Sequence, residues 1–454
     1  MSTMNRSLLV DLYELTMADC YLTYRQHAFA TFDLFVRQLP KNRTYLVACG
    51  LEDVLSYIEN LRFSREDIDY LRKQKLFSKD FLDYLKDFEF SGDIWAVPEG
   101  TIVFAQEPIL RVTASIIEAQ IIESYLLNTV NLQTMIASKA ARVVWAAKDK
   151  AVYDFSLRRT HGLDAAVKVA RSSYIAGVAG TSNVLAGRLY GIPIVGTMAH
   201  SFIMSFKQEL DSFLAYSHMF PGRTILLVDT YNTKRGIQNA ITIGLYLKDR
   251  GYRLLGIRLD SGDLVFLSQM ARQMLDNAGL NYVKIFASGN LDEFKIEDIL
   301  KKGACIDSFG VGTNMGTSED APYLDIIYKV SEVTDENKRF LPTMKLSKAK
   351  VTYPGRKQIF RIQDKKGRFI KDIIGLEKET IRGKPLLIKV IDKGRVIYKN
   401  PTLKKIRAGL KKNLDRFPKE LKEIRSDYYY PVVISSQLKK LTWGLTMQLK
   451  NRQR

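Results

Sequence analysis

The pattern of hydrophobic and polar residues becomes regular near residue 150. From there, short apolar runs alternate with amphipathic stretches, so that each predicted strand is followed by a predicted helix. The predicted strands begin at Val152, Pro193, Thr224, Arg253, Tyr282 and Ile306. Apolar strands bounded by turn residues and followed by helices are typical of a parallel sheet covered by helices. Six such units in one run favour a closed or nearly closed α/β barrel, with an open doubly wound sheet as the alternative.

The segments on either side have a mixed pattern. Predicted strands cover 32–37, a strand pair around a turn covers 94–105, a buried helix covers 116–130, short strands lie at 360–364, 386–391 and 395–398, and a charged helix covers 404–415. We therefore predict three parts. A mixed α+β N-terminal domain covers 1–130, a barrel that carries the active site covers 131–350, and a basic, strand-rich region packed on the N-terminal domain covers 351–454.

The net charge of +20 is concentrated in the last part of the chain. Residues 351–454 contain 28 Lys and Arg against 9 Asp and Glu, whereas residues 1–350 contain 41 against 40. A basic surface attracts phosphates, but Lys and Arg are also common on surfaces that only maintain solubility. Because no recognisable nucleic-acid-binding motif accompanies the charge, we expect a solvated surface and no nucleic-acid partner.

The cysteines and the apolar runs indicate where the protein works. Cys20, Cys49 and Cys305 lie far apart, which argues against both a disulfide framework and a zinc site. The N-terminus has no signal-peptide pattern, and no run of about 18 apolar residues occurs. We expect a soluble, cytoplasmic protein without a membrane partner.

The candidate chemistry gathers where the predicted strands end, which is where α/β proteins bind ligands. Six segments follow the strands: 158–162, 196–201, 229–232, 258–263, 287–290 and 310–314. The glycine-rich ends offer backbone N–H groups to an anion, and the arginines Arg158, Arg159 and Arg258 offer planar forks for carboxylate or phosphate. The aspartates at these ends could hold ribose hydroxyls or magnesium. Together they predict a site for a phosphorylated sugar and a second anion.

Each feature taken alone also has a structural interpretation. Asp-Ser-Gly-Asp at 260–263 is a common turn and helix cap, and the arginine pair could form a structural ion pair with Glu or Asp.

Two classes of nucleotide-binding protein are disfavoured because their motifs are absent. The chain has no P-loop, and no Gly-x-Gly-x-x-Gly opens a helix after the first strand. The predicted site for a phosphorylated sugar and a second anion rests on all six strand ends, which carry residues suited to the same kind of ligand.

Several motifs resemble those of the nicotinate phosphoribosyltransferase family. They are Asp11–Ala18 (DLYELTMA), Phe35–Pro40, Arg43 with Tyr45, Gly50–Leu51, Ser182–Ala186, Gly196–Ser201, Val228–Tyr231 and Arg258–Leu264. Their order and spacing extend the resemblance over nearly the whole chain, although the segment after 350 is the least distinctive. The acidic pair before Thr-Gly, which phosphoribosyltransferases of the other major fold carry, is absent.

The resemblance implies an irregular α/β barrel (the type II phosphoribosyltransferase fold) beside a mixed N-terminal domain. It also implies a head-to-tail homodimer with active sites at the interface. The implied reaction transfers phosphoribosyl from phosphoribosyl pyrophosphate to nicotinate, giving nicotinate mononucleotide and pyrophosphate for NAD biosynthesis. ATP is the implied co-substrate and Mg²⁺ the expected cofactor, with no metal ligand assigned with certainty.

The resemblance also assigns roles to residues. Arg158 and Arg159 would face the nicotinate carboxylate and sugar phosphates, and Tyr13 of the neighbouring subunit would stack on the pyridine ring. His200 would be phosphorylated by ATP, the alternative being a simple contact with pyrophosphate. Arg258 and Asp260 complete the expected catalytic set. Further expected substrate-binding residues are Gly196, Thr197, Ser201, Asp229, Ser261, Gly262, Asp263, Ser288, Gly289, Asn290, Gly312, Thr313 and Asn314, of which Asp229, Asp260 and Asp263 are the candidates for ribose and magnesium.

Two other pyridine substrates are the nearest alternatives. Nicotinamide has no carboxylate to need the Arg158 and Arg159 pair, and quinolinate has a second carboxylate that would demand a denser basic pocket. An alternative from a different functional class is a nucleic-acid-binding protein that binds through the basic residues of 351–454.

Overall fold

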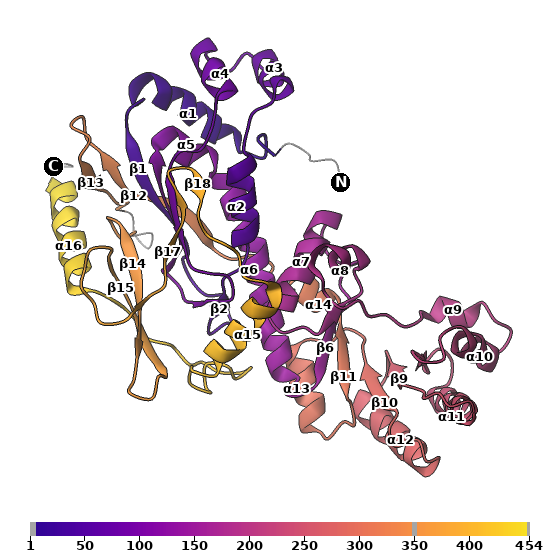
Figure 1. The fold of residues 1–454 in the computed structure, drawn as a ribbon. Coiled ribbons are helices and arrows are strands. Elements are labelled where there is room, and N and C mark those ends of the chain that lie inside the picture. The colour runs from indigo at the N-terminus through magenta and orange to yellow at the C-terminus, as the bar shows by residue number, and fades with distance from the viewer. Residues whose placement is uncertain (1–5, 347–351, 452–454) are drawn as a thin grey trace. The chain divides into compact units, whose positions relative to one another are not determined.

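The computed structural model describes residues 6–346 and 352–451, which belong to two compact units (Figure 1). Unit 1 comprises Met1–Met135, Tyr323–Leu421 and Ser426–Arg454, and unit 2 comprises Ile136–Pro322 and Lys422–Arg425. The boundary near residue 135 falls inside the long helix α6 (Glu123–Ala146). The three-part division near 130 and 350 stays a prediction from the sequence.

Unit 2 contains the predicted parallel sheet, in the order β7-β6-β11-β10-β9-β8, and every pairing is parallel. Its strands are β6 (Ala151–Asp154), β7 (Gly180–Thr181), β8 (Ile225–Leu227), β9 (Gly256–Leu259), β10 (Lys284–Ala287) and β11 (Ser308–Val311). Its helices are α7 (Leu163–Ile175), α8 (Val184–Tyr190), α9 (His200–Met204), α10 (Glu209–Met219), α11 (Thr233–Asp249), α12 (Leu264–Asn277), α13 (Glu293–Lys301) and α14 (Thr313–Gly316). This alternation confirms the predicted α/β class.

The sheet departs from a regular barrel between β7 and β8. The strand predicted from Pro193 is reduced to a bridge between Thr181 and Ile194, and among the described residues the edge strands β7 and β8 are not paired. Pro193 has no N–H to donate, although its carbonyl still accepts from the Thr181 N–H at 3.0 Å. The helix predicted over 203–216 is likewise divided, into α9 and α10. The sheet is therefore irregular at the point where the chain approaches His200.

The core of unit 2 explains why the strands are so apolar. Leu226 on β8, Ile257 on β9 and Ile285 on β10 are completely buried, and Ile237 on α11 and Leu275 on α12 belong to the same cluster. Burying one such side chain stabilises the fold by roughly 1.5–3 kcal/mol. The apolar strand interiors thus hold the sheet together, while the strand ends stay free for polar residues.

Unit 1 contains two larger antiparallel or mixed sheets. A seven-stranded sheet has the order β13-β12-β1-β5-β3-β17-β18, and a four-stranded sheet has the order β16-β14-β15-β19. Their strands are β1 (Phe29–Val36), β3 (Asp93–Ala96), β5 (Pro108–Ser115), β12 (Ile326–Thr334), β13 (Phe340–Pro342), β14 (Lys357–Gln363), β15 (Phe369–Leu376), β16 (Lys384–Pro385), β17 (Ile388–Asp392), β18 (Arg395–Val396) and β19 (Val432–Ile434). The helices are α1 (Leu12–Tyr24), α2 (Leu51–Asn60), α3 (Arg65–Lys73), α4 (Lys79–Lys86), α5 (Ile116–Ile121), the start of α6, α15 (Leu403–Leu414) and α16 (Ser436–Asn451).

Two details of unit 1 differ from the sequence prediction. The predicted strand pair at 94–105 is wrong, because β3 pairs with β5 and β17, whereas β4 (Ile102–Val103) pairs with β2 (Leu46–Val47). The turn at Gly100, with a positive φ of 77°, directs the chain away from β3. The buried helix predicted over 116–130 is interrupted at Ile122, between α5 and α6.

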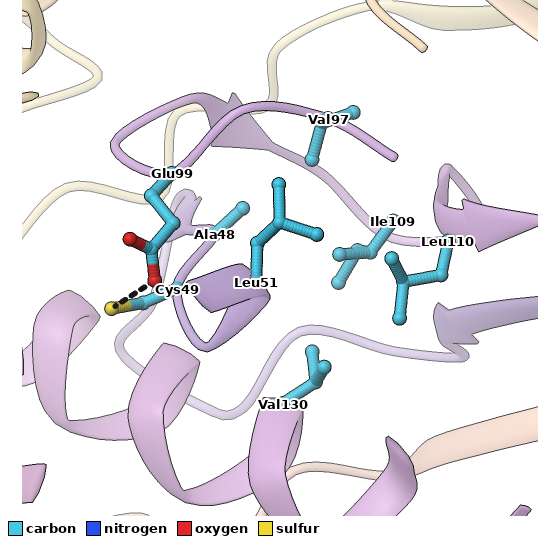
Figure 2. Close-up of a pocket in the computed structure, with 8 residues that line it drawn as sticks. All are labelled: Ala48, Cys49, Leu51, Val97, Glu99, Ile109, Leu110 and Val130. Carbon is cyan, nitrogen blue, oxygen red and sulfur yellow. Dashed lines mark hydrogen bonds between the residues drawn. The ribbon is translucent and has the colours of Figure 1, made fainter. Parts of the chain in front are cut away.

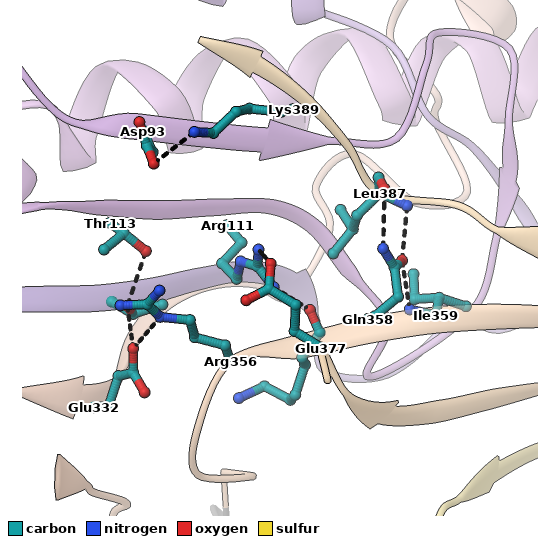
Figure 3. A network of polar contacts seen from close by, with 12 residues as sticks. Asp93, Arg111, Thr113, Glu332, Arg356, Gln358, Ile359, Glu377, Leu387 and Lys389 are labelled. Atoms are coloured by element: carbon teal, nitrogen blue, oxygen red, sulfur yellow. Dashed lines mark hydrogen bonds and ion pairs between the residues drawn. The ribbon is translucent and has the colours of Figure 1, made fainter. Parts of the chain in front are cut away.

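The C-terminal region is built into unit 1 and is not a separate arm. Strand β17 pairs with β3, and buried Arg111 on β5 donates to the Lys357 carbonyl at 2.7 Å and forms an ion pair with Glu377 (Figure 3). The buried Lys357 ammonium lies 2.7 Å from the Asp33 carboxylate on β1. Part of the basic charge of 351–454 therefore holds the sheets of unit 1 together.

A small cavity lies in unit 1 among largely apolar side chains (Figure 2). Its lining residues are Ala48, Cys49, Leu51, Val97, Glu99, Ile109, Leu110 and Val130. The Glu99 carboxylate accepts from the Gly50 N–H at 2.7 Å and lies 3.6 Å from the Cys49 sulfur. The polar groups of this cavity are therefore engaged with the protein itself.

Two further observations concern the cysteines and the helices. Cys20, Cys49 and Cys305 are all free thiols, in line with the scattered spacing. Within 6–346 and 352–451, no helix combines the length and the apolar character that crossing a membrane requires.

Candidate active site

His200 is the first residue of α9 and stands beside the ends of β8 and β9. Its Nδ1 atom lies 3.0 Å from the Thr230 hydroxyl oxygen, and its Nε2 atom lies 3.8 Å from the Asp260 carboxylate. The side chain remains 40% exposed. One ring nitrogen is therefore held by a neighbour while the ring stays accessible, which is the arrangement a nucleophilic imidazole needs.

Arg258, on β9, links three strand ends. Its guanidinium donates to the Ser288 hydroxyl at 2.7 Å and to Asp260 at 2.5 Å. The Nη1 atom lies within 3.4 Å of the Thr197 hydroxyl and the Met198 carbonyl, just before His200. Arg258 thus places a positive charge among the expected ligand groups and connects them to one another.

Asp260 lies within the same cluster and is ionised. Burial opposes its ionisation, but the hydrogen bond from Ser288 and the positive charge of Arg258 outweigh burial and lower the pKa of Asp260. The cluster therefore holds a negative charge next to the imidazole of His200 and a positive charge at Arg258.

Asp229 and Asp263 have different surroundings. Asp229 accepts from the Asp260 N–H at 2.8 Å and from the Ser261 hydroxyl at 2.7 Å through one oxygen. Its other oxygen is buried and has no hydrogen-bond partner among the described residues. Asp263 instead caps α12 by accepting from the Val265 and Phe266 N–H groups. Asp263, the last residue of the Asp-Ser-Gly-Asp motif, therefore serves as a helix cap, as the structural interpretation of this motif expects.

The ends of β10 and β11 form the glycine-rich part of the site. Gly289 has a φ of +100°, and a Cβ there would lie 1.9 Å from the Asp260 carbonyl oxygen, so only glycine fits. The Asn314 amide donates to the Asn290 carbonyl at 3.4 Å, while its buried Oδ1 has no partner in the described structure. The glycine therefore allows the end of β10 to pack directly against the backbone of Asp260.

Arg158 and Arg159 project from a turn that follows β6. Both are exposed, and within the described ranges neither guanidinium has a hydrogen bond or an ion pair. The Arg159 and Thr160 N–H groups donate to the Ser156 carbonyl at 2.8 and 3.0 Å. The pair is therefore not consumed by a structural ion pair, and both forks are available to an anion.

The remaining predicted residues are distributed over both units. Gly196, Ser261 and Gly262 are exposed in loops of unit 2, and Ser201 is exposed on α9. Ser288 is buried, Gly312 is the N-cap of α14, and Thr313 is its first residue. Tyr13 belongs to unit 1, where it lies on α1 and is 46% exposed. The structure thus brings together the predicted residues of unit 2 at one end of a parallel sheet.

Sequence reasoning missed two residues that organise this site. The Thr230 hydroxyl contacts the ring of His200. The feature in the sequence that could have pointed to it is its position directly after Asp229, at a predicted strand end. Asp154 is buried beneath the arginine turn, and its signal was a carboxylate inside an otherwise apolar strand.

No metal centre is built from protein side chains alone in the part of the chain that the structure describes. Groups of three or more His, Cys, Asp or Glu side chains arranged to hold an ion are absent from 6–346 and 352–451. The carboxylates of Asp229 and Asp260, which sequence reasoning put forward for magnesium, lie next to each other in the site.

Comparison with known proteins identifies the family. Three family descriptions match successive segments: the nicotinate phosphoribosyltransferase N-terminal domain over residues 8–131, the nicotinate phosphoribosyltransferase family over 151–368, and the nicotinate phosphoribosyltransferase C-terminal domain over 380–442. These segments include most of both units.

Full-length relatives and solved structures agree with this match. A nicotinate phosphoribosyltransferase of Mycobacterium tuberculosis is 46% identical over 95% of this chain and 92% of its own length, and that of Bacillus subtilis is 38% identical over 97% and 94%. The crystal structure of human nicotinic acid phosphoribosyltransferase superposes with a TM-score of 0.86 at 28% identity, covering 96% of this chain and all of the other. A nicotinate-nucleotide pyrophosphorylase from Pyrococcus furiosus gives a TM-score of 0.73 at 25% identity, over 92% of this chain and 97% of its own. The chain belongs to the nicotinate phosphoribosyltransferase family.

Proposed function

We propose that this enzyme joins nicotinate to phosphoribosyl pyrophosphate and couples the reaction to ATP through His200. As a nicotinate phosphoribosyltransferase, it forms nicotinate mononucleotide and pyrophosphate for NAD biosynthesis. The observation that carries the proposal is the cluster at the strand ends, in which His200 and Arg258 contact Asp260, and the Asp260 N–H donates to Asp229.

The chemistry requires positioning and electrostatics more than proton transfer. Displacing pyrophosphate from ribose C1 passes through an oxocarbenium-like state, and the pyridine nitrogen of nicotinate attacks directly. The protein must therefore hold a positive sugar between a leaving anion and the pyridine ring. Asp229 and Asp260 supply negative charge for the sugar side, and the glycine-rich loops at Gly289 and Gly312 supply backbone N–H groups for phosphate oxygens.

The free arginines favour a substrate with one carboxylate. Arg158 and Arg159 offer two planar forks, one suited to the nicotinate carboxylate and the other to phosphate. Nicotinamide would leave one fork without a charged partner. Quinolinate would add a second carboxylate that has to share the same two groups.

His200 is the group proposed to accept the phosphoryl group of ATP. Its ring is partly exposed and held by Thr230, and phosphorylation would add roughly two negative charges beside Asp260 and Arg258. Repulsion from Asp260 and attraction to Arg258 would change how tightly anionic substrates and products are held. This is a physical route by which ATP hydrolysis could drive product formation.

We propose that Mg²⁺ enters the site bound to the phosphate groups of the enzyme's substrates. Phosphoribosyl pyrophosphate and ATP are themselves magnesium ligands, and Mg²⁺ keeps few protein ligands in such sites. Asp229 and Asp260 are the strand-end carboxylates proposed to contact it.

A homodimer with shared active sites is the proposed assembly. Both units expose large apolar side chains, including Leu12 (56%) and Tyr13 on unit 1, and Val184 (66%) and Leu189 (55%) on unit 2. A partner subunit is one way to cover such side chains. In this arrangement Tyr13 would be supplied to each site by the partner subunit.

A product assay tests the substrate. Purified protein is given phosphoribosyl pyrophosphate, ATP and Mg²⁺ with nicotinate, nicotinamide or quinolinate in parallel. We expect nicotinate mononucleotide from nicotinate alone. Product from nicotinamide or quinolinate but not from nicotinate would show that the role assigned to the arginine pair is wrong.

A further inference from the structure

Asp154 joins three segments at the carboxyl end of β6. One of its oxygens accepts from the N–H and the hydroxyl of Ser156, at 2.9 and 2.5 Å. The other oxygen accepts from the Thr181 hydroxyl at 2.8 Å, at the end of the neighbouring strand β7. All three side chains are at most 1% exposed. Three donors converge on one buried carboxylate; burial raises the pKa of Asp154, and the hydrogen bonds from Ser156 and Thr181 counteract part of that effect.

Ser156 in turn begins the turn that carries the arginines. Its carbonyl accepts from the N–H groups of Arg159 and Thr160 and from the Thr160 hydroxyl at 3.0 Å. On its other side the turn packs against α14, where a Cβ on Gly316 would lie 2.2 Å from the Ser156 Cβ. Ser156, at the base of the turn, is therefore held by hydrogen bonds to Asp154 and by close packing against Gly316.

The arginines themselves have no such support. Arg158 and Arg159 are exposed, and within 6–346 and 352–451 their guanidiniums have no hydrogen-bonded or ionic partner. Their positions in the free protein depend on the backbone of the turn alone. A small displacement of such groups is enough to weaken recognition of a carboxylate or phosphate.

We propose that Asp154 is a positioning residue for the Arg158 and Arg159 pair, which it aims at the anionic substrate by anchoring Ser156. The inference rests on the proposed function, because it takes the pair as the recognition site for the carboxylate and phosphate of the substrates. Asp154 does not touch the ligand. Its carboxylate oxygen holds the turn by accepting from Ser156, and a side chain that cannot accept from Ser156 leaves the turn free to move.

Binding of nicotinate mononucleotide, measured by calorimetry, tests this proposal without relying on turnover. The product carries both a carboxylate and a phosphate. Four proteins form a cycle: the parent, Asp154→Ala, the double variant Arg158→Ala/Arg159→Ala, and the triple variant. We expect Asp154→Ala to weaken binding about tenfold in the parent, and by no more than about twofold when both arginines are absent. A merely structural role would give the same loss in both backgrounds and would overturn the proposal.

Two control variants separate the anchor from general stability. Thr181→Val removes the donor to the other carboxylate oxygen, so it should lower the melting temperature but leave affinity within about twofold. Asp154→Asn keeps an oxygen for Ser156 and should retain affinity within about threefold. If Asp154→Ala does not fold, Ser156→Ala tests the same contact from the other end. It should weaken binding about threefold, and unchanged affinity would contradict the proposal.

Failure of the proposed function would look different. In that case the parent itself would not bind nicotinate mononucleotide, whatever residue occupies position 154. If the parent binds the product but the affinity losses in the cycle are additive, the proposed function stands and the role of Asp154 is rejected.

Discussion

The Nδ1 atom of His200 lies 3.0 Å from the hydroxyl oxygen of Thr230, at the carboxyl end of β8. This contact fixes the orientation of a histidine that stands among the charged groups of the site. It also means that the chemistry of His200 depends on a residue from another strand end.

Thr230→Val should slow phosphorylation of His200 by ATP. Valine has the shape of threonine but no hydroxyl, and loss of one such hydrogen bond costs about 1 kcal/mol, or roughly a fivefold change in rate. Incorporation of labelled phosphate from the γ position of ATP measures the effect. Thr230→Ser keeps the hydroxyl and should label at close to the parent rate. Equal labelling of the Thr230→Val and parent proteins would mean that Thr230 does not orient the ring.

Replacing Arg158 or Arg159 by alanine should raise the KM for nicotinate. A charge-assisted hydrogen bond contributes about 1.5–3 kcal/mol, so each change should raise the KM by roughly ten- to a hundredfold. Arg223→Ala, which removes an exposed arginine elsewhere in unit 2, is the matched control and should leave the KM unchanged. Steady-state assays at saturating phosphoribosyl pyrophosphate give the comparison. A KM unaffected by either substitution would remove the pair from substrate recognition.

Glu14 on α1 should make stability depend on pH. Burial, reinforced by the negative charges of Glu123 and Asp11, raises the pKa of Glu14 to about 8, although a hydrogen bond from Ser124 works in the opposite direction. Between its ordinary pKa of 4.5 and about 8, the unfolded chain ionises this group while the folded chain does not. The free energy of unfolding should therefore fall as pH rises through this window.

Glu14→Gln should remove that contribution. The variant should have a higher melting temperature than the parent near pH 8, with the difference shrinking toward pH 4.5. Glu66→Gln, at an exposed position on α3, is the control and should follow the parent. Melting temperatures measured across this range provide the test. A constant difference between the Glu14→Gln variant and the parent at all pH values would contradict the assignment.

The Arg361–Asp372 pair should be essential to the stability of unit 1. Both side chains are buried, their closest atoms lie 2.6 Å apart, and Arg361 also donates to the Ile102 carbonyl at 2.8 Å. Asp372→Ala would leave a buried guanidinium without its carboxylate, at a cost of about 3–5 kcal/mol. Chemical denaturation measures this loss.

Glu107 provides the matched control for that experiment. Burial and the nearby charge of Asp372 raise the pKa of Glu107 well above its ordinary value, which favours the neutral form. Glu107→Gln therefore preserves its charge state and should cost less than about 1 kcal/mol. A loss for Glu107→Gln as large as that for Asp372→Ala would show that Glu107 is ionised.

The parallel sheet of unit 2 could be predicted from the sequence because its signal is local. Each buried strand is a short apolar run, and each strand end carries its polar residues directly afterwards, as at Asp229 and Asp260. The carboxyl ends of parallel strands share one edge of a sheet, so sequence order alone predicts that these residues converge.

Pairing over long sequence distances was not predictable in the same way. Strand β3 looks like the partner of the segment after Gly100, yet it pairs with β5 and with β17, almost 300 residues later. Nothing in the local pattern around Ile94 specifies that partner. The same holds for Asp154, whose second carboxylate oxygen accepts from Thr181 in a neighbouring strand.

The roles of the aspartates needed coordinates as well. Asp229, Asp260 and Asp263 look alike in sequence. In the structure Asp229 accepts from the Asp260 N–H and the Ser261 hydroxyl, Asp260 is paired with Arg258, and Asp263 caps a helix. A carboxylate at a strand end can serve any of these purposes. Its hydrogen-bond partners decide which one applies.

The most direct test of the central claim is the rate of nicotinate mononucleotide formation with and without ATP, in the parent enzyme and in His200→Ala. We predict that the parent forms the product from nicotinate and phosphoribosyl pyrophosphate and is stimulated by ATP. The variant should form it at one rate whether or not ATP is present. Stimulation by ATP that survives in His200→Ala would contradict the account.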